Sequence, residues 1–142
     1  MKIRKVWMAG TVLGGVLCCA SALGAPSPTC QRYGEIAFAA WTQGLYGAVG
    51  QHFSAEVKIH LSPSVLHAMW QQLVAQAGKF ESLGRFVPRT LDGHAMMAAP
   101  MKFQAMNMAA VFACNPKDQI VGLQILDPAQ VPALRSLDAG LH

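Results

Sequence analysis

Sulfur and imidazole side chains are concentrated in one short stretch of the 142-residue sequence. Within residues 94–108 the chain carries one histidine and five methionines: His94, Met96, Met97, Met101, Met106 and Met108. Thioether and imidazole groups are soft ligands that suit Cu(I), but methionine also fills irregular gaps in hydrophobic cores. In a strand Met97 and Met101 would share one face and Met96 would take the other. Core packing is therefore the favoured interpretation, and Cu(I) binding is the alternative.

Nucleophilic hydrolysis has little support in the sequence. The G-x-S-x-G motif is absent, and the serines near histidines occupy predicted caps and turns: Ser54, Ser62 and Ser64. The remaining histidines show no metal-ligand spacing: His52, His60, His67 and His142. The sequence therefore predicts no catalytic residue, no metal site and no cofactor.

Acid–base catalysis inside a cavity is the other enzymatic alternative, and it needs a buried carboxylate or imidazole. The seven acidic residues are Glu35, Glu56, Glu81, Asp92, Asp118, Asp127 and Asp138. Several fall in predicted turns or at the ends of elements, and none lies in the apolar face of a predicted strand. We therefore expect a protein without catalytic activity.

Four aromatic residues would line the mouth of a cavity if the predicted sheet curves enough: Trp41, Tyr46, Trp70 and Phe103. Aromatic residues at helical spacing more often belong to the core. In that alternative Trp70 would be the centre of the packing between helix and sheet.

The elements that position these residues follow a secretion signal. Basic residues precede an apolar run over 6–17, and small residues then lead to a cleavage site after Ala22 or Gly24. The run is short for an uncleaved anchor. We expect residues 1–24 to be the signal, residues 25–29 a short leader, and the mature protein to be periplasmic or secreted and free of the membrane.

Removal of the signal changes the charge balance. The whole chain has 11 Lys and Arg against 7 Asp and Glu. Three of the basic residues lie in the signal, so the mature chain carries 8 against 7. Nucleic-acid binding needs clustered basic residues on one face, so no nucleic-acid partner is expected.

Two cysteines remain in the mature chain, Cys30 and Cys114. In an oxidising compartment two cysteines favour one bridge. Cys30 would begin the first helix and Cys114 would end a strand, and helices laid on a meander bring these ends within reach. The sequence therefore predicts a Cys30–Cys114 disulfide.

Residues 62–84 are expected to organise the fold. Ser62 suits the N-cap, Pro63 the first helical position and Gly78 a left-handed stop. The apolar residues between them fall on one helical face: Val65, Leu66, Met69, Trp70, Leu73, Val74 and Ala77. Upstream, the pattern predicts a helix over about 30–41, a weaker helix over 45–53, and a connection over 54–61.

After Gly78 the hydrophobic period changes from that of a helix to that of a strand. Strands are predicted over 83–91, 94–104, 107–113 and 119–126, with Asp92-Gly93 as a hairpin turn. Residues 30–126 would form one domain and residues 127–142 a tail with a helical turn around 131–137. The predicted class is α+β, with N-terminal helices packed on a curved four-stranded antiparallel meander, as in cystatin-like and nuclear-transport-factor-like cones.

Residues 44–126 also resemble a bacterial domain family of unknown function, found in exported proteins alone or ahead of an α/β-hydrolase domain. The pattern is a helix ending in W-x-x-L, a downstream G-x-F and small residue, and strands closing with I-x-G-L. The matching residues are Trp70, Leu73, Gly78, Phe80, Gly84, Ile120, Gly122 and Leu123. The family usually has glycine in the last hairpin, where this chain has Asp118-Gln119. The resemblance carries no catalytic residue.

These observations favour an exported, non-catalytic binding or accessory domain whose partner is a protein or a small apolar ligand. A specific form of this hypothesis is an inhibitor or immunity partner of a secreted hydrolase. The alternatives are Cu(I) binding through the methionine segment, and a small-molecule-binding protein or cavity enzyme of the nuclear-transport-factor-like type.

Overall fold

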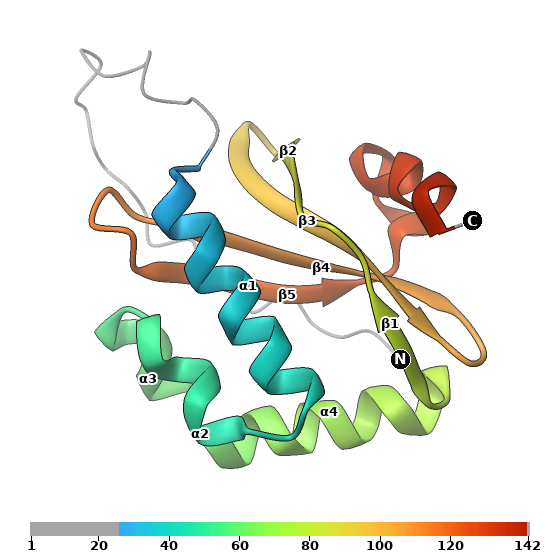
Figure 1. The fold of residues 1–142 in the computed structure, drawn as a ribbon, viewed down its shortest axis with the longest axis horizontal. Coiled ribbons are helices and arrows are strands. Elements are labelled where there is room, and N and C mark those ends of the chain that lie inside the picture. Colours follow the sequence, from blue (N-terminus) through green and yellow to red (C-terminus); the bar gives the residue numbers. More distant parts are fainter. Residues whose placement is uncertain (1–25, 142) are drawn as a thin grey trace.

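The computed structural model describes residues 26–141, in which helices precede an antiparallel sheet (Figure 1). The helices before the sheet are α1 (Pro28–Thr42), α2 (Tyr46–Val49), η2 (Gly50–His52), α3 (Ala55–His60) and α4 (Pro63–Ala77). The strands are β1 (Phe80–Leu83), β2 (Val87–Leu91), β3 (His94–Phe103), β4 (Asn107–Cys114) and β5 (Ile120–Leu126). Two 3-10 helices follow, η3 (Pro128–Gln130) and η4 (Pro132–Leu141). The predicted α+β class is confirmed. The predicted signal lies outside the described residues.

The sheet has five strands but is four strands wide. Its order is β1-β3-β4-β5, and β2 pairs with the same edge of β3 as β1 does. β1 pairs with residues 101–103 of β3, and β2 pairs with residues 94–98. The sequence predicted one strand over 83–91, which the structure interrupts at Gly84. The Gly84 N–H donates to the Pro100 carbonyl at 2.8 Å, and Phe86 turns into the core.

One face of the sheet packs against the helices, and α1 supplies the centre of this core. Ser27 caps α1 by accepting a hydrogen bond from the Cys30 N–H, and Pro28 occupies the first turn. Phe38 and Trp41 are 0% and 1% exposed. Alternate residues of the strands face them, with Ala99, Met101 and Phe103 of β3 and Ala110 and Phe112 of β4 in the same core.

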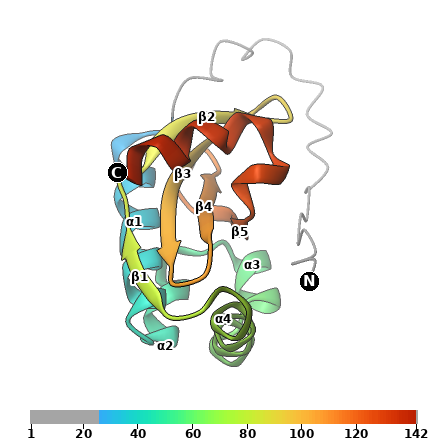
Figure 2. The same ribbon diagram turned by 90° about the vertical axis from the view of Figure 1, so that its right-hand side faces the viewer.

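The other face of the sheet is covered by the C-terminal segment, which the sequence had suggested was only a tail. Leu134 and Leu137 of η4 are buried against Met96, Ala98 and Val111. In a 3-10 helix residues three apart share one side, so these two leucines face the sheet together. Figure 2 shows η4 lying across the β2–β3 end of the sheet, at the opposite end of the molecule from α4.

The predicted helix beginning at Ser62 is confirmed, although it lies at the margin of the core. Ser62 accepts from the Val65 N–H at 3.3 Å, and Gly78 ends the helix with a φ of 83°. Leu66 and Leu73 are buried, whereas Val65 is 40% exposed. The expectation that this stretch organises the fold is therefore wrong, because α1 holds that position.

The region before α4 differs from the predicted weak helix followed by a connection. The helix predicted over 45–53 is split into α2 and η2, and Leu45 is 54% exposed. Residues 55–60 form α3, which the sequence analysis missed. The local signal was present, since Ser54 caps α3 through the Val57 N–H and Glu56 lies in its first turn.

Two helical glycines give a matched test of this packing. A Cβ at Gly34 would lie 2.0 Å from the Phe112 ring, so Gly34→Ala forces α1 away from β4. We expect the free energy of unfolding to fall by about 1–3 kcal/mol. A Cβ at Gly47 would meet nothing within 4 Å. Gly47→Ala is therefore expected to raise stability by up to about 1 kcal/mol. Urea denaturation measures both, and equal effects of the two substitutions would contradict the described packing.

Candidate binding groove

The two cysteines of the described chain are joined. Cys30 and Cys114 form a disulfide with a Cα–Cα distance of 6.0 Å, so the predicted pairing is confirmed. Cys30 lies in the first turn of α1 and Cys114 ends β4. Because both sulfurs are in the bridge, neither is a thiol nucleophile in this form.

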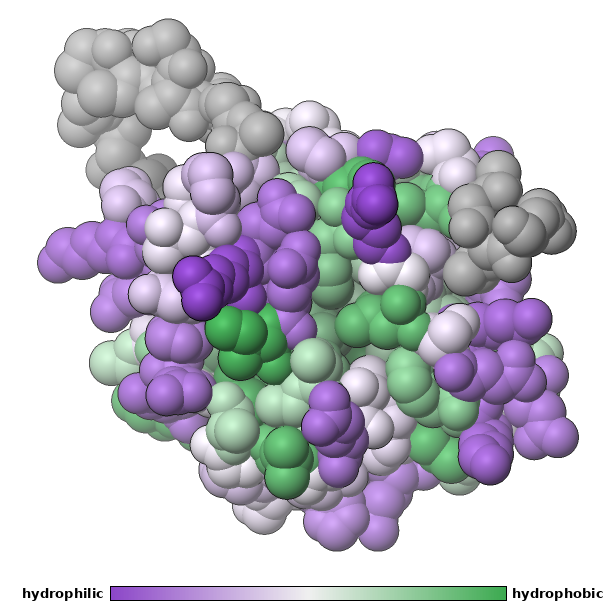
Figure 3. Space-filling model, viewed as in Figure 1, coloured by the Kyte–Doolittle hydropathy of each residue, from purple (hydrophilic) through white to green (hydrophobic). Residues whose placement is uncertain are grey.

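Three of the four aromatic residues proposed to line a cavity mouth meet in a filled cluster. Trp70 packs against Trp41 and Phe103, with ring centroids 6.3 and 5.8 Å apart. Phe80 closes the cluster at 5.6 Å from Trp70. Trp41 and Phe103 are buried, and Trp70 and Phe80 are half-buried. On the face of the molecule seen in Figure 3, hydrophobic side chains reach the surface between α1 and β1. These rings therefore occupy the region where an open cone would have its mouth.

Trp41 also makes the polar contact that fixes α4. Its Nε1–H donates to the Leu66 carbonyl at 3.0 Å, inside the core. A buried indole N–H needs such a partner. Trp41, and not Trp70 as expected, is the centre of the packing between the helices and the sheet.

The fourth aromatic residue, Tyr46, lies apart from that cluster and lines a surface groove. Its ring stacks on His67 of α4, with centroids 4.6 Å apart and an interplanar angle of 18°. The groove has a volume of about 500 Å³ and is open to solvent. Its lining comes from α2, η2, α3 and the start of α4: Tyr46, Gly47, Ala48, Gly50, Gln51, Lys58, Leu61 and Pro63.

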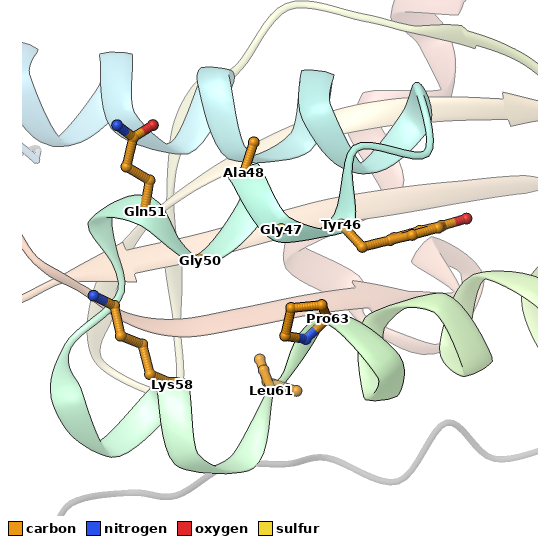
Figure 4. Close-up of a pocket in the computed structure, with 8 residues that line it drawn as sticks. All are labelled: Tyr46, Gly47, Ala48, Gly50, Gln51, Lys58, Leu61 and Pro63. Atoms are coloured by element: carbon orange, nitrogen blue, oxygen red, sulfur yellow. The ribbon is translucent and has the colours of Figure 1, made fainter.

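Figure 4 shows how the groove is arranged. Lys58 of α3 and Gln51 of η2 lie at one end, with the Gln51 side chain pointing away from Lys58, and Tyr46 and Pro63 lie at the other. The α2 side between them consists of Gly47, Ala48 and Gly50, so nothing larger than a methyl group projects there. The groove is therefore an open trough lined by both apolar and polar atoms, with Lys58 at one end.

Lys58 is the one charged residue among those that line the groove. No ion pair or hydrogen bond links its side chain to another of the described residues. Three large hydrophobic residues are exposed on the same or adjoining segments: Leu45, Ile59 and Val65 at 54%, 77% and 40%. A partner for this region would combine apolar side chains with a negative group.

The methionines lie on both faces of the sheet. Met97, Met101 and Met108 belong to the core on the helix side, and Met96 belongs to the core under η4. Met106 is 37% exposed in the turn before β4, and His94 is exposed at the start of β3. The sheet separates Met96 from Met97, so these residues do not converge, and hydrophobic packing accounts for the four buried ones.

The acidic residues whose side chains are described also remain dispersed. Asp127 caps η3 by accepting from the Ala129 N–H at 2.9 Å, and Asp118 accepts from the Ser27 hydroxyl. Glu81 lies 3.7 Å from Lys102 on the surface. Among the described residues no group of three His, Cys, Asp or Glu side chains is placed to hold a metal ion.

No protein-family model, curated protein or solved structure matches the chain. The resemblance to an exported bacterial family therefore stays a prediction. None of the helices within residues 26–141 combines the length and the hydrophobicity that a membrane span requires.

Of the residues that line the groove, only Tyr46 was a predicted site residue, and it was predicted at the mouth of a cavity in the sheet. A signal was available in the spacing of Gly47 and Gly50, which both line the groove. Glycines three apart on one helical turn leave a bare strip on its surface. The opposite wall could not be inferred, because it depends on how α3 is placed against α2 in the fold.

The roles of the two tryptophans are separable by stability measurements. Trp41→Ala removes a fully buried ring and its hydrogen bond, so we expect a loss of about 3–5 kcal/mol in the free energy of unfolding. Trp70→Ala removes a half-buried ring, and the expected loss is about 1–3 kcal/mol. Chemical denaturation of both variants checks this order. A larger loss for Trp70→Ala would contradict the assignment of Trp41 as the centre.

Proposed function

We propose that the protein is an exported, non-catalytic binding domain that holds a segment of a partner protein in the groove between α2, α3 and α4. The observation that carries the proposal is an open trough of mixed lining with one cation, Lys58, which has no ion-pair partner among the described residues. The disulfide supports an oxidising compartment, where such bonds persist.

The shape of the groove favours a protein segment over a small molecule. Small-molecule sites usually enclose most of the ligand surface. This groove has a comparable volume, about 500 Å³, but is open to solvent. An extended or helical peptide segment needs contacts along only one of its faces, so an open trough can bind it.

The charge of the groove favours a segment with a carboxylate. Lys58 supplies the charge at one end, and Leu61 and Pro63 offer apolar contact. An inhibitor or immunity partner of a secreted hydrolase is one role that fits a small domain of this kind. That role rests on analogy with other small exported domains.

The two alternative functions receive less support. Cu(I) binding needs thioethers that converge, whereas Met96 and Met97 face opposite cores. A cavity enzyme needs a buried acid or base, and the region between Trp41, Trp70 and Phe103 holds packed aromatic rings.

The proposal is tested with peptides selected from a random displayed library against the purified protein lacking residues 1–24. We expect the selected peptides to combine apolar residues with Asp or Glu. Their affinity, measured by titration calorimetry, should fall about tenfold for Lys58→Glu, since attraction becomes repulsion. Gly47→Leu should block binding, because the leucine side chain fills the trough. A Cβ at this helical position meets nothing within 4 Å, so the substitution should leave the fold intact.

Lys79→Glu is the matched control. This substitution changes the net charge by the same amount as Lys58→Glu, but Lys79 lies beyond the end of α4 that is far from the groove. Its affinity should equal that of the unmodified protein. Failure to enrich any peptide, or equal binding by the Gly47→Leu variant, would refute the groove as the binding site.

A further inference from the structure

The end of the groove away from Lys58 carries an exposed histidine on its rim. His67 of α4 stacks on the ring of Tyr46, with centroids 4.6 Å apart and an interplanar angle of 18°. Tyr46 and Pro63 lie together at this end of the groove (Figure 4). His67 follows Pro63 by four residues in α4, so the two side chains share one face of the helix, one turn apart. The imidazole therefore lies next to the groove, beyond Pro63 and against Tyr46.

The stack between Tyr46 and His67 can form with either charge state of the imidazole. A neutral aromatic pair prefers an offset stack of this kind. A cation within about 6 Å of the centre of a tyrosine ring is also attracted to its face. Histidine is the side chain whose charge ordinarily changes between about pH 5 and pH 8. Protonation of His67 therefore adds a positive charge at this end of the groove and leaves both rings in place.

Few charges surround this imidazole. Tyr46 is the one titratable residue of α2, and α4 contains no Asp, Glu, Lys or Arg. Residues 36–42 of α1, which reach α4 through Trp41, are uncharged as well. The titratable groups on the other segments around α4 are His52 of η2, Glu56, Lys58 and His60 of α3, Lys79 after α4, and the Glu81–Lys102 ion pair of β1 and β3. Lys58 is thus the permanent cation of the groove, and His67 is placed to add a second one.

We infer that His67 is a second recognition group of this groove, and that it makes the affinity for a carboxylate-bearing segment depend on pH. The inference rests on the proposed function and describes the partner more closely, as a segment with an acidic residue at each end of its apolar part. One carboxylate lies near Lys58 and the other near the protonated His67.

The direction of the pH dependence follows from this arrangement. A carboxylate beside an imidazole favours its protonated form, so binding takes up a proton. By linkage, protonation then favours binding, and the affinity rises as the pH falls. The Asp and Glu residues of the partner segment stay ionised down to about pH 5, so both charges are present together in mildly acidic solution.

The test uses a peptide selected from the displayed library at about pH 5.5, where the imidazole is charged. Titration calorimetry then measures its affinity for the protein lacking residues 1–24 at this pH and at about pH 8. We expect binding to be about three- to fivefold tighter at the lower pH, the range for one exposed ion pair. Titrations in buffers that differ in ionisation enthalpy should show net proton uptake on binding.

Substitutions at His67 separate its charge from its ring. His67→Phe keeps a ring on Tyr46 without a charge, so it should bind with the weaker affinity at both pH values. His67→Arg keeps a stacking group that is always charged, so it should bind with the tighter affinity at both. His52→Phe is the matched control, because His52 stacks on Tyr33 of α1 with centroids 3.6 Å apart and does not line the groove. Its pH dependence should equal that of the unmodified protein.

Equal affinities of the unmodified protein at the two pH values would overturn this inference and leave the proposed function standing. A pH dependence that persists in His67→Phe would also overturn it, because another group would then be responsible. Absence of binding at both pH values would overturn the inference together with the proposed function. Circular dichroism melts of each variant at both pH values confirm that these outcomes come from folded protein.

Discussion

The attachment of α1 to β4 is the constraint on which the rest of the structure depends. The Cys30–Cys114 disulfide joins the start of the helix to the end of the strand. One turn further on, Gly34 brings the helix backbone onto the Phe112 ring, where a methyl group would not fit. Phe38 and Trp41 then fill the core, and the Trp41 indole N–H holds the Leu66 carbonyl of α4. Both α2 and α4 are therefore positioned by contacts that begin on α1.

The packing of aromatic rings between the helices and the sheet restricts where a ligand could bind. In an open cone the space between helices and sheet would be a ligand cavity. Here Trp41, Trp70 and Phe103 pack together in that region. The binding site that we propose therefore lies outside this core, in the groove beside Tyr46. The C-terminal helices cover the second face of the sheet.

Local signals predicted much of the fold correctly. Ser62, Pro63 and Gly78 mark the ends of α4, Asp92-Gly93 marks the hairpin between β2 and β3, and alternating residues mark β4 and β5. The disulfide followed from two cysteines placed at the ends of neighbouring elements. The caps, the turn and the strand alternation depend on a few adjacent residues, and the pairing follows from there being two cysteines after the predicted signal, so one sequence is enough to predict them.

Apart from α3, whose capping signal is local, the features that were missed depend on contacts between distant residues. The break at Gly84 follows from its fit against Pro100, and the burial of Leu134 follows from an apolar strip on the far face of the sheet. The groove needs α3 opposite Gly47, and neither wall alone indicates a site. Trp41 and Trp70 have similar local sequence contexts, and only the position of α1 makes Trp41 the buried one.

The most direct test of this account is to measure stability and amide hydrogen exchange with the disulfide intact and after its reduction. The bridge spans 84 residues, so its full entropic effect is about 4–5 kcal/mol. We expect reduction to lower the free energy of unfolding by about 2–4 kcal/mol. We also expect exchange to accelerate first in α1 and in the helices that α1 positions, before β3 and β4. Unchanged stability, or exchange that accelerates first in the sheet, would contradict the central place given to the attachment of α1 to β4.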